Sequence, residues 1–253
     1  MTNKILYSSG SGIATITLNR PGKRNALDSE MVDGVQQALS RSASDAGVRV
    51  VVITGAGQDF CAGADLAALQ QLQDAGPMEN LADARRLADL FLEMRRHPRP
   101  IVAMVRGRAL AGGCGLATSA DIVLAAESAE FGYPEINIGF VPAMVMAILR
   151  RSVAERRAFE LLTTGERIPA PKALEIGLIN RVYADNVFEA EVERYVTQLV
   201  ARPASALTLT KSLMYQMDGL TFEAALSAGV QANVLARLTD DYRRGIEQFL
   251  KTS

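Results

Sequence analysis

A glycine-rich stretch in the middle of the chain has the composition of a backbone anion site. The apolar run Ile101–Val105 is followed by residues 108–121, in which Gly112, Gly113 and Gly115 open an Ala/Leu segment. A strand that turns directly into a helix leaves unpaired N–H groups at the helix start, and glycine lets a ligand atom approach them. Such groups can stabilise a carbonyl oxygen that gains negative charge. The same residues would equally suit a plain strand-to-helix turn.

Two further segments offer complementary groups. Residues 60–66, Phe-Cys-Ala-Gly-Ala-Asp-Leu, follow an apolar strand predicted over residues 48–54 and add more backbone N–H groups. Residues 133–139, Tyr-Pro-Glu-Ile-Asn-Ile-Gly, place Glu135 before an Ile-x-Ile run. A carboxylate against an apolar wall has a raised pKa and becomes a usable acid or base near neutral pH. Alone, Glu135 would instead be interpreted as a surface residue after a proline turn.

Taken in this order and at these separations, the three segments resemble the crotonase superfamily, also called the enoyl-CoA hydratase/isomerase family. Asn19-Arg-Pro with Asn25-Ala-Leu, Pro100-Ile-Val-Ala with Gly107, and Arg244-Gly-Ile-Glu-Gln-Phe extend the resemblance over nearly the whole chain. It implies an α/β fold with a crotonase-like core of repeated ββα turns in residues 1–195. It also implies a C-terminal helical region in residues 196–253 that serves trimerisation, and trimers of this family commonly pair into hexamers.

The resemblance further implies an acyl-CoA substrate and the residues that hold it. The N–H groups of Ala64 and Gly112 would bind the thioester oxygen, and Glu135 would act as general acid and base. Coenzyme A is then part of the substrate, and we expect no permanently bound cofactor and no metal. The implied coenzyme A-binding residues are Lys23, Arg24, Ala26, Ala62, Asp65 and Leu66. Asp65 would equally serve as a helix cap, and Lys23, Arg24 and Lys251, the phosphate candidates, as solvated surface residues.

The sequence departs from the hydratase pattern at Gly115, where archetypal hydratases of this family carry a second glutamate. This puts concerted addition of water by a carboxylate pair in doubt. Glu135 alone would suffice for a Δ3,Δ2-enoyl-CoA isomerase, and could also activate water and return the proton to the α-carbon. A decarboxylase or another lyase acting through the same enolate stays open. Hydration of a 2-enoyl-CoA is favoured, since residues 135–144 also resemble branched-chain-type hydratases that lack the first glutamate.

Two other classes of protein compete with the interpretation as an acyl-CoA enzyme. A nucleotide-binding dehydrogenase is suggested by residues 50–57, a strand that runs into Gly-Ala-Gly, but the third glycine of that motif is missing and Phe60 stands in its place. A non-catalytic acyl-CoA binder would not need Glu135. The single histidine, His97, lies in a predicted loop, so chemistry that depends on histidine is not expected.

Alternating strands and helices must position these groups. Residues 5–7 and 13–18 predict a β-hairpin, and Asp28 precedes a helix with helical spacing from Met31 to Leu39. Buried strands are predicted over 48–54, 101–105 and 122–125, and helices follow one another from Pro142 onward. The pattern favours stacked β-containing turns over a barrel.

The composition sets outer limits on function. The chain has 253 residues, 49% of them hydrophobic, and a net charge of −1, so neither a nucleic-acid binder nor a disordered protein is indicated. Cys61 and Cys114 stand apart, which argues against a disulfide framework. No run has the length of a membrane span and no signal peptide is indicated, so we expect a cytoplasmic protein.

Overall fold

A six-stranded sheet forms the centre of the computed structural model, which describes residues 3–252. Its strand order is β1-β2-β3-β4-β6-β9, with an antiparallel β1-β2 hairpin and parallel pairing between all other neighbours. Apolar and β-branched residues dominate its inner strands because both faces are covered. The strands are β1 (Ile5–Gly10), β2 (Ile13–Leu18), β3 (Val50–Gly55), β4 (Ile101–Val105), β6 (Ile122–Ala126) and β9 (Arg181–Tyr183).

A smaller three-stranded sheet is formed by segments that follow the carboxyl ends of strands of the large sheet: β5 follows β4, and β7 follows β6. In the smaller sheet, β7 pairs in parallel with β5 and antiparallel with β8. Three short 3-10 helices lie in the described connecting segments. The elements are β5 (Arg108–Leu110), β7 (Glu130–Gly132), β8 (Arg167–Pro169), η1 (Pro21–Lys23), η2 (Leu72–Asp74) and η3 (Pro134–Ile138).

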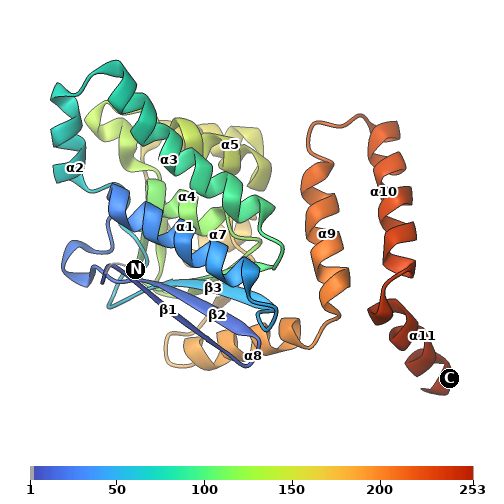
Figure 1. The fold of residues 1–253 in the computed structure, drawn as a ribbon. Helices are drawn as coiled ribbons and strands as arrows, with labels where there is room; N and C mark the ends of the chain where they lie inside the picture. The colour runs from blue at the N-terminus through green and yellow to red at the C-terminus, as the bar shows by residue number, and fades with distance from the viewer. Residues whose placement is uncertain (1–2, 253) are drawn as a thin grey trace.

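Helices cover both faces of the large sheet. The described helices are α1 (Ser29–Ser44), α2 (Leu66–Gln71), α3 (Pro77–Arg96), α4 (Gly112–Thr118), α5 (Ala143–Ser152), α6 (Glu155–Thr164), α7 (Ala170–Glu175), α8 (Phe188–Val200), α9 (Ala204–Gln216), α10 (Phe222–Arg237) and α11 (Asp240–Thr252), of which the last three lie away from the sheet (Figure 1). Because strand residues alternate in direction, Val51 and Ile53 of β3 enter the larger core, which includes residues of α1, α3 and α4. Val50 and Val52 enter a second core between the sheet and α8. Helix α8 lies on the opposite face of the sheet from α1 and α3 (Figure 1).

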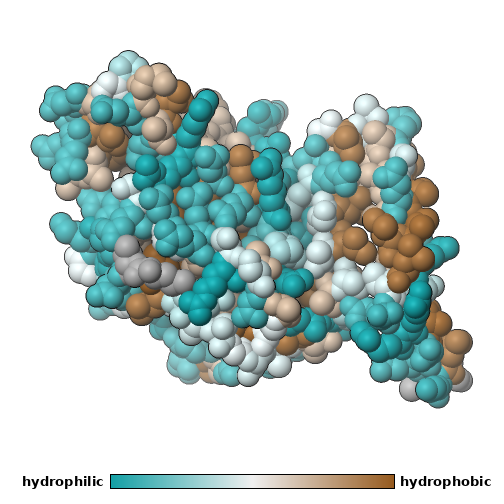
Figure 2. All heavy atoms as spheres, viewed as in Figure 1, coloured by the Kyte–Doolittle hydropathy of each residue, from teal (hydrophilic) through white to brown (hydrophobic). Residues whose placement is uncertain are grey.

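The last three helices leave this core. Helix α9 stays attached through Lys211, whose Nζ lies 2.7 Å from Oδ2 of Asp121, the residue before β6. Helices α10 and α11 stand farther out (Figure 1). Apolar side chains gather on these helices on the face that Figure 2 shows. The exposed ones include Phe222, Leu226, Val230, Val234, Leu238, Ile246, Phe249 and Leu250.

The predicted fold class is confirmed. The hairpin, the strands at 48–54, 101–105 and 122–125 and the helices after Pro142 are all present, each to within a few residues. The three-residue strands β5, β7, β8 and β9 were not predicted, because so few residues show no alternation. The predicted boundary between residues 195 and 196 lies inside α8, and the division into a core and a trimerisation region stays a prediction. Within residues 3–252, no helix is long and apolar enough to cross a membrane.

Candidate active site

Backbone hydrogen bonds bring four segments that are separate in the sequence side by side: the loop before α1, the 61–65 loop, β5 and the end of β7. Leu27 donates its N–H to Gly63 O (2.7 Å), and Leu27 O accepts from Asp65 N (2.8 Å). The 61–65 loop is bonded in turn to β5, because Leu110 N donates to Cys61 O (2.9 Å). Ala111 N then donates to the O of Gly132, at the end of β7 (2.8 Å). The segments singled out in the sequence therefore form one continuous wall.

This wall borders a cavity of about 570 Å³. All nine predicted site residues line it: Lys23, Arg24, Ala26, Ala62, Ala64, Asp65, Leu66, Gly112 and Glu135. Lys251, the other phosphate candidate, lies on α11 and is not among the residues that line the cavity in this chain.

Two backbone N–H groups at this cavity are available to a ligand. Gly63 and Asp65 are both hydrogen-bonded to Leu27. The N–H of Ala64, the residue between them, therefore points away from Leu27. Gly112 is the first residue of α4, where N–H groups have no partner inside the helix. None of the hydrogen bonds found among residues 3–252 uses either N–H. The partial positive charge of the helix start adds to the attraction for an anionic oxygen at Gly112.

Glu135 is a half-buried acid group with one buried carboxylate oxygen, Oε2, that has no hydrogen-bond partner among the described residues. It lies on η3, directly after β7. Burial raises the pKa of Glu135 above the ordinary value of a glutamate. A carboxylate in this state is suited to accept a proton from a substrate and to return it.

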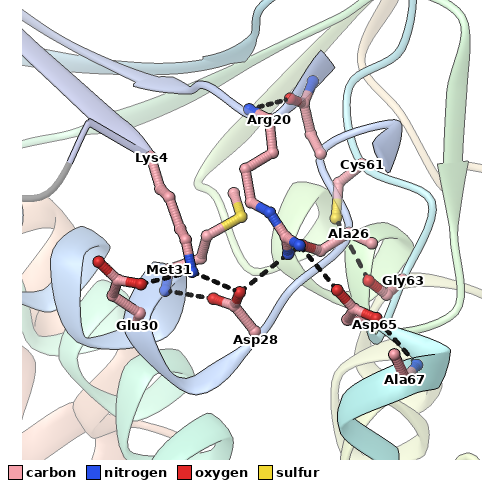
Figure 3. Close-up of polar contacts among 11 residues, drawn as sticks. Lys4, Arg20, Ala26, Asp28, Glu30, Met31, Cys61, Gly63, Asp65 and Ala67 are labelled. Carbon is pink, nitrogen blue, oxygen red and sulfur yellow. Dashed lines mark hydrogen bonds and ion pairs between the residues drawn. The ribbon is translucent and has the colours of Figure 1, made fainter. Parts of the chain in front are cut away.

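Asp65, the other carboxylate at the cavity, is already engaged. Figure 3 shows Arg20 between Asp28 and Asp65, and its Nη2 donates to Asp65 Oδ2 at 2.8 Å. The second oxygen of Asp65 caps α2 by accepting from Ala67 N (2.9 Å). The hydrogen bond from Arg20 holds the pKa of Asp65 below its usual range. Asp65 therefore fixes the loop that carries Ala64 and is a poor proton acceptor.

The position of the family's other glutamate is closed by apolar side chains. A Cβ added to Gly115 would lie 2.3 Å from Cγ1 of Val145 and 3.2 Å from Cζ of Phe91. Val145 belongs to α5, which packs directly on α4. No side chain larger than hydrogen fits at residue 115 unless the Val145 side chain moves, and Gly115 itself supplies no carboxylate partner to Glu135.

Sequence reasoning expected apolar residues of the helices after Glu79 and Val141 to line the acyl end of the site, but it named none of the side chains in this part of the cavity wall. Asn137, Phe140, Val141 and Met144 also line it, and they lie within nine residues of Glu135, so their nearness in sequence could have indicated them. Arg167 also lines the cavity, because β8 pairs with β7 and sets it opposite Gly132. Nothing in the sequence gives that pairing.

The rival sequence features lie outside this site. Gly55 and Gly57 do not line the cavity, and a Cβ on Gly55 would lie 2.3 Å from the O of Asp59, so that glycine serves a tight backbone turn. His97 is buried beside Ser42 Oγ (3.0 Å), where burial lowers its pKa. Residues 3–252 contain no group of three or more His, Cys, Asp or Glu side chains that could hold a metal ion.

Comparisons with known proteins identify the family of the chain. The family model "Enoyl-CoA hydratase/isomerase" matches residues 8–253. A Thermus thermophilus relative that carries an enoyl-CoA hydratase name is 39% identical over 94% of both chains. The 2,3-dehydroadipyl-CoA hydratase of Escherichia coli is 32% identical over 98% of this chain and 96% of its own. A crystal structure of a Mycobacterium smegmatis enoyl-CoA hydratase superposes with a TM-score of 0.94 at 31% identity, over 98% of this chain and 96% of its own. The chain belongs to the enoyl-CoA hydratase/isomerase family.

Proposed function

We propose that this protein hydrates a 2-enoyl-CoA, with Glu135 as general acid and base and the N–H groups of Ala64 and Gly112 as the oxyanion hole. The observation that carries the proposal is the meeting of a half-buried carboxylate, whose Oε2 has no hydrogen-bond partner among the described residues, with two unbonded backbone N–H groups at one cavity. The hydratase names of the relatives support hydration over other reactions of the family.

The reaction would proceed with one carboxylate. Ionised Glu135 accepts a proton from water as the water oxygen bonds to the β-carbon of the substrate. The electron pair of the double bond moves toward the thioester carbonyl, whose oxygen gains negative charge at the N–H groups of Ala64 and Gly112. Protonated Glu135 then gives its proton to the α-carbon. The product is a 3-hydroxyacyl-CoA, and Glu135 returns to its ionised form.

Coenzyme A would lie toward Lys23 and Arg24. Both cations line the cavity, and no ion pair to either is found among residues 3–252. Their charges suit the phosphates of the nucleotide. Ala26, Ala62 and Leu66 would form the adjoining contact surface.

A second candidate, Δ3,Δ2-enoyl-CoA isomerisation, is favoured by the closed position at Gly115. With Val145 Cγ1 filling that space, one carboxylate must do all the proton transfer. Isomerisation requires only that Glu135 move a proton between the α- and γ-carbons.

Product analysis separates the two. The purified protein is given crotonyl-CoA and longer 2-enoyl-CoA esters, and separately 3-enoyl-CoA esters, and both product mass and the absorbance of the conjugated 2-enoyl thioester are recorded. A gain of one water from the 2-enoyl esters is expected, and Glu135→Gln should lower turnover by about 10²- to 10⁴-fold while still binding acyl-CoA. Conversion of the 3-enoyl esters without a mass change, and no hydration, would establish the isomerase instead. A non-catalytic binder would bind acyl-CoA and turn over neither.

We further propose a homotrimer or homohexamer, supported by the exposed apolar faces of α10 and α11. A cytoplasmic setting is supported by Cys61 and Cys114, which are both buried and free.

A further inference from the structure

A second, smaller cavity adjoins the first and is lined by residues of α1, α2 and α3. Its volume is about 70 Å³. The two cavities share five lining residues: Ala64, Asp65, Leu69, Leu87 and Gly112. Side chains in this shared wall therefore decide whether the two volumes form one continuous space.

Leu87 is the side chain in the wall that is best placed to act as the barrier. Ala64 and Gly112 have no side chain beyond Cβ, and Asp65 is held by Arg20. Of the two leucines in the shared wall, Leu69 and Leu87, Leu87 is the one that packs against the main core. Leu87 Cδ2 lies 3.7 Å from the position of a Cβ on Gly112, so the leucine lies directly beside the proposed oxyanion donor. It is half-buried and packs against the main core from α3.

The smaller cavity has the lining that an aliphatic chain requires. Apolar side chains come from all three helices and the loop before α1. Of its charged members, Asp28 is paired with Lys4 and Arg20, Asp65 with Arg20, and Arg86 with Asp33, which leaves Asp83 as the charged side chain of the lining without an ion pair among residues 3–252. Its apolar lining includes Leu27, Val32, Ala68 and Leu72. An alkyl group that entered it would exchange water for apolar contacts.

We propose that Leu87 sets the upper limit of acyl-chain length, by closing the substrate's acyl end off from the smaller cavity. The inference rests on the proposed function, which places the thioester oxygen at Ala64 and Gly112. The acyl carbons next to that thioester lie beside Leu87. Chains short enough to stay in the larger cavity fit, and longer chains must displace the Leu87 side chain to enter the smaller one.

The test compares acyl length preference in wild type, Leu87→Ala and Leu87→Val. Truncating the side chain joins the cavities, so the ratio of kcat/KM for 2-dodecenoyl-CoA to that for crotonyl-CoA should increase about tenfold or more, in line with the effect of added methylenes in an apolar pocket. Calorimetric binding of saturated dodecanoyl-CoA and butanoyl-CoA supplies the same ratio without turnover. Leu87→Val should give a smaller change in the same direction, and it covers the case in which Leu87→Ala does not fold.

Two controls make the result specific. Leu81→Ala removes an exposed leucine of the same helix that lines neither cavity, and it should leave the ratio unchanged. Ala68→Phe fills the smaller cavity without touching the lining of the larger one, and in the Leu87→Ala background it should restore the wild-type ratio. An unchanged ratio in folded Leu87 variants, or a shift that survives Ala68→Phe, overturns the proposal. If no enoyl-CoA is turned over but the binding ratio shifts as expected, the length limit stands and the proposed hydration fails.

Discussion

Glu135 combines two properties that normally oppose each other, burial and a function that requires ionisation. Because burial raises its pKa, the folded protein holds this proton more tightly than the unfolded chain does. The contribution to stability is therefore full at low pH and decreases as pH rises through the folded-state pKa. The group destabilises the fold in the form that catalysis needs, which is common where stability and activity compete.

This linkage predicts opposite pH dependences for activity and stability. The kcat/KM of wild type should increase with pH through the raised pKa of Glu135, because the ionised form accepts the proton. The free energy of unfolding of Glu135→Gln should exceed that of wild type, by a margin that grows over the same pH range. Titration of both quantities in one buffer series checks the pair, and a margin that shrinks as pH rises would contradict the assignment.

The oxyanion donor at Gly112 can be removed without removing the helix. Gly112 is the first residue of α4, a position that tolerates proline, and Gly112→Pro deletes the N–H. We expect a loss in kcat of about 10²- to 10³-fold, as for other oxyanion donors. Gly112→Ala is the matched control, since its Cβ would meet Leu87 at 3.7 Å and Leu27 at 3.9 Å, ordinary contact distances, and the N–H is kept. Equal losses in both variants would mean that space rather than the donor matters.

Residue 115 offers a test of the one-carboxylate site. Gly115→Ala should destabilise the protein by about 1–3 kcal/mol, because the added methyl overlaps Val145. Gly115→Glu should be worse and should not raise hydration. Val145→Ala in the Gly115→Ala background should recover part of the loss, and chemical unfolding of the single and double variants measures it. A fully additive pair would show that α5 yields without strain.

At the scale of elements, the individual strands and helices were predicted from the sequence better than the contacts between them. The long strands and amphipathic helices were predicted because alternation and 3.6-residue spacing are visible over many residues. The neighbours of the 61–65 loop were not predicted from the residues, since that loop is placed by single bridges, Leu27 to Ala64 and Cys61 to Ala109. Glu135 and Gly112 were singled out from the residues themselves, and the roles of Ala64 and of the coenzyme A-binding residues were assigned through family resemblance. Arg167 could be found in neither way, because its place in the lining depends on a contact between distant segments.

Helix α9 is attached to the core by a buried ion pair that the sequence did not indicate. Asp121 accepts from Lys211 Nζ (2.7 Å), Tyr215 Oη (2.6 Å) and Ile101 N (2.6 Å). Removing the carboxylate with Asp121→Ala would leave the buried ammonium unpaired, at a cost of about 3–5 kcal/mol. The double variant Asp121→Ala/Lys211→Met should cost less than Asp121→Ala alone. Urea unfolding of both measures this, and a more costly double variant would rule out the unpaired charge as the cause.

At the scale of the whole molecule, α10 carries an apolar stripe that no other part of residues 3–252 covers. Phe222, Leu226, Val230, Val234 and Leu238 recur every four residues and are all more than half exposed. A contiguous apolar surface of this kind marks a protein interface in a folded protein. Since α10 stands away from its own core, a second copy of the chain is the partner we predict (Figure 1).

Sedimentation or light scattering of the purified protein should therefore give three or six times the mass of one chain. Leu226→Asp with Val230→Asp places two charges in the stripe, which the interface would have to desolvate, and should yield monomers. Circular dichroism should show that the large sheet and its helices stay folded, because α10 contributes no buried residue to either core. Gln231→Asp is the control, because Gln231 is exposed, directly follows Val230 and is not part of the stripe. This variant should leave the assembly intact. Monomeric wild type, or an assembly that survives the double variant, would show that the stripe has another purpose.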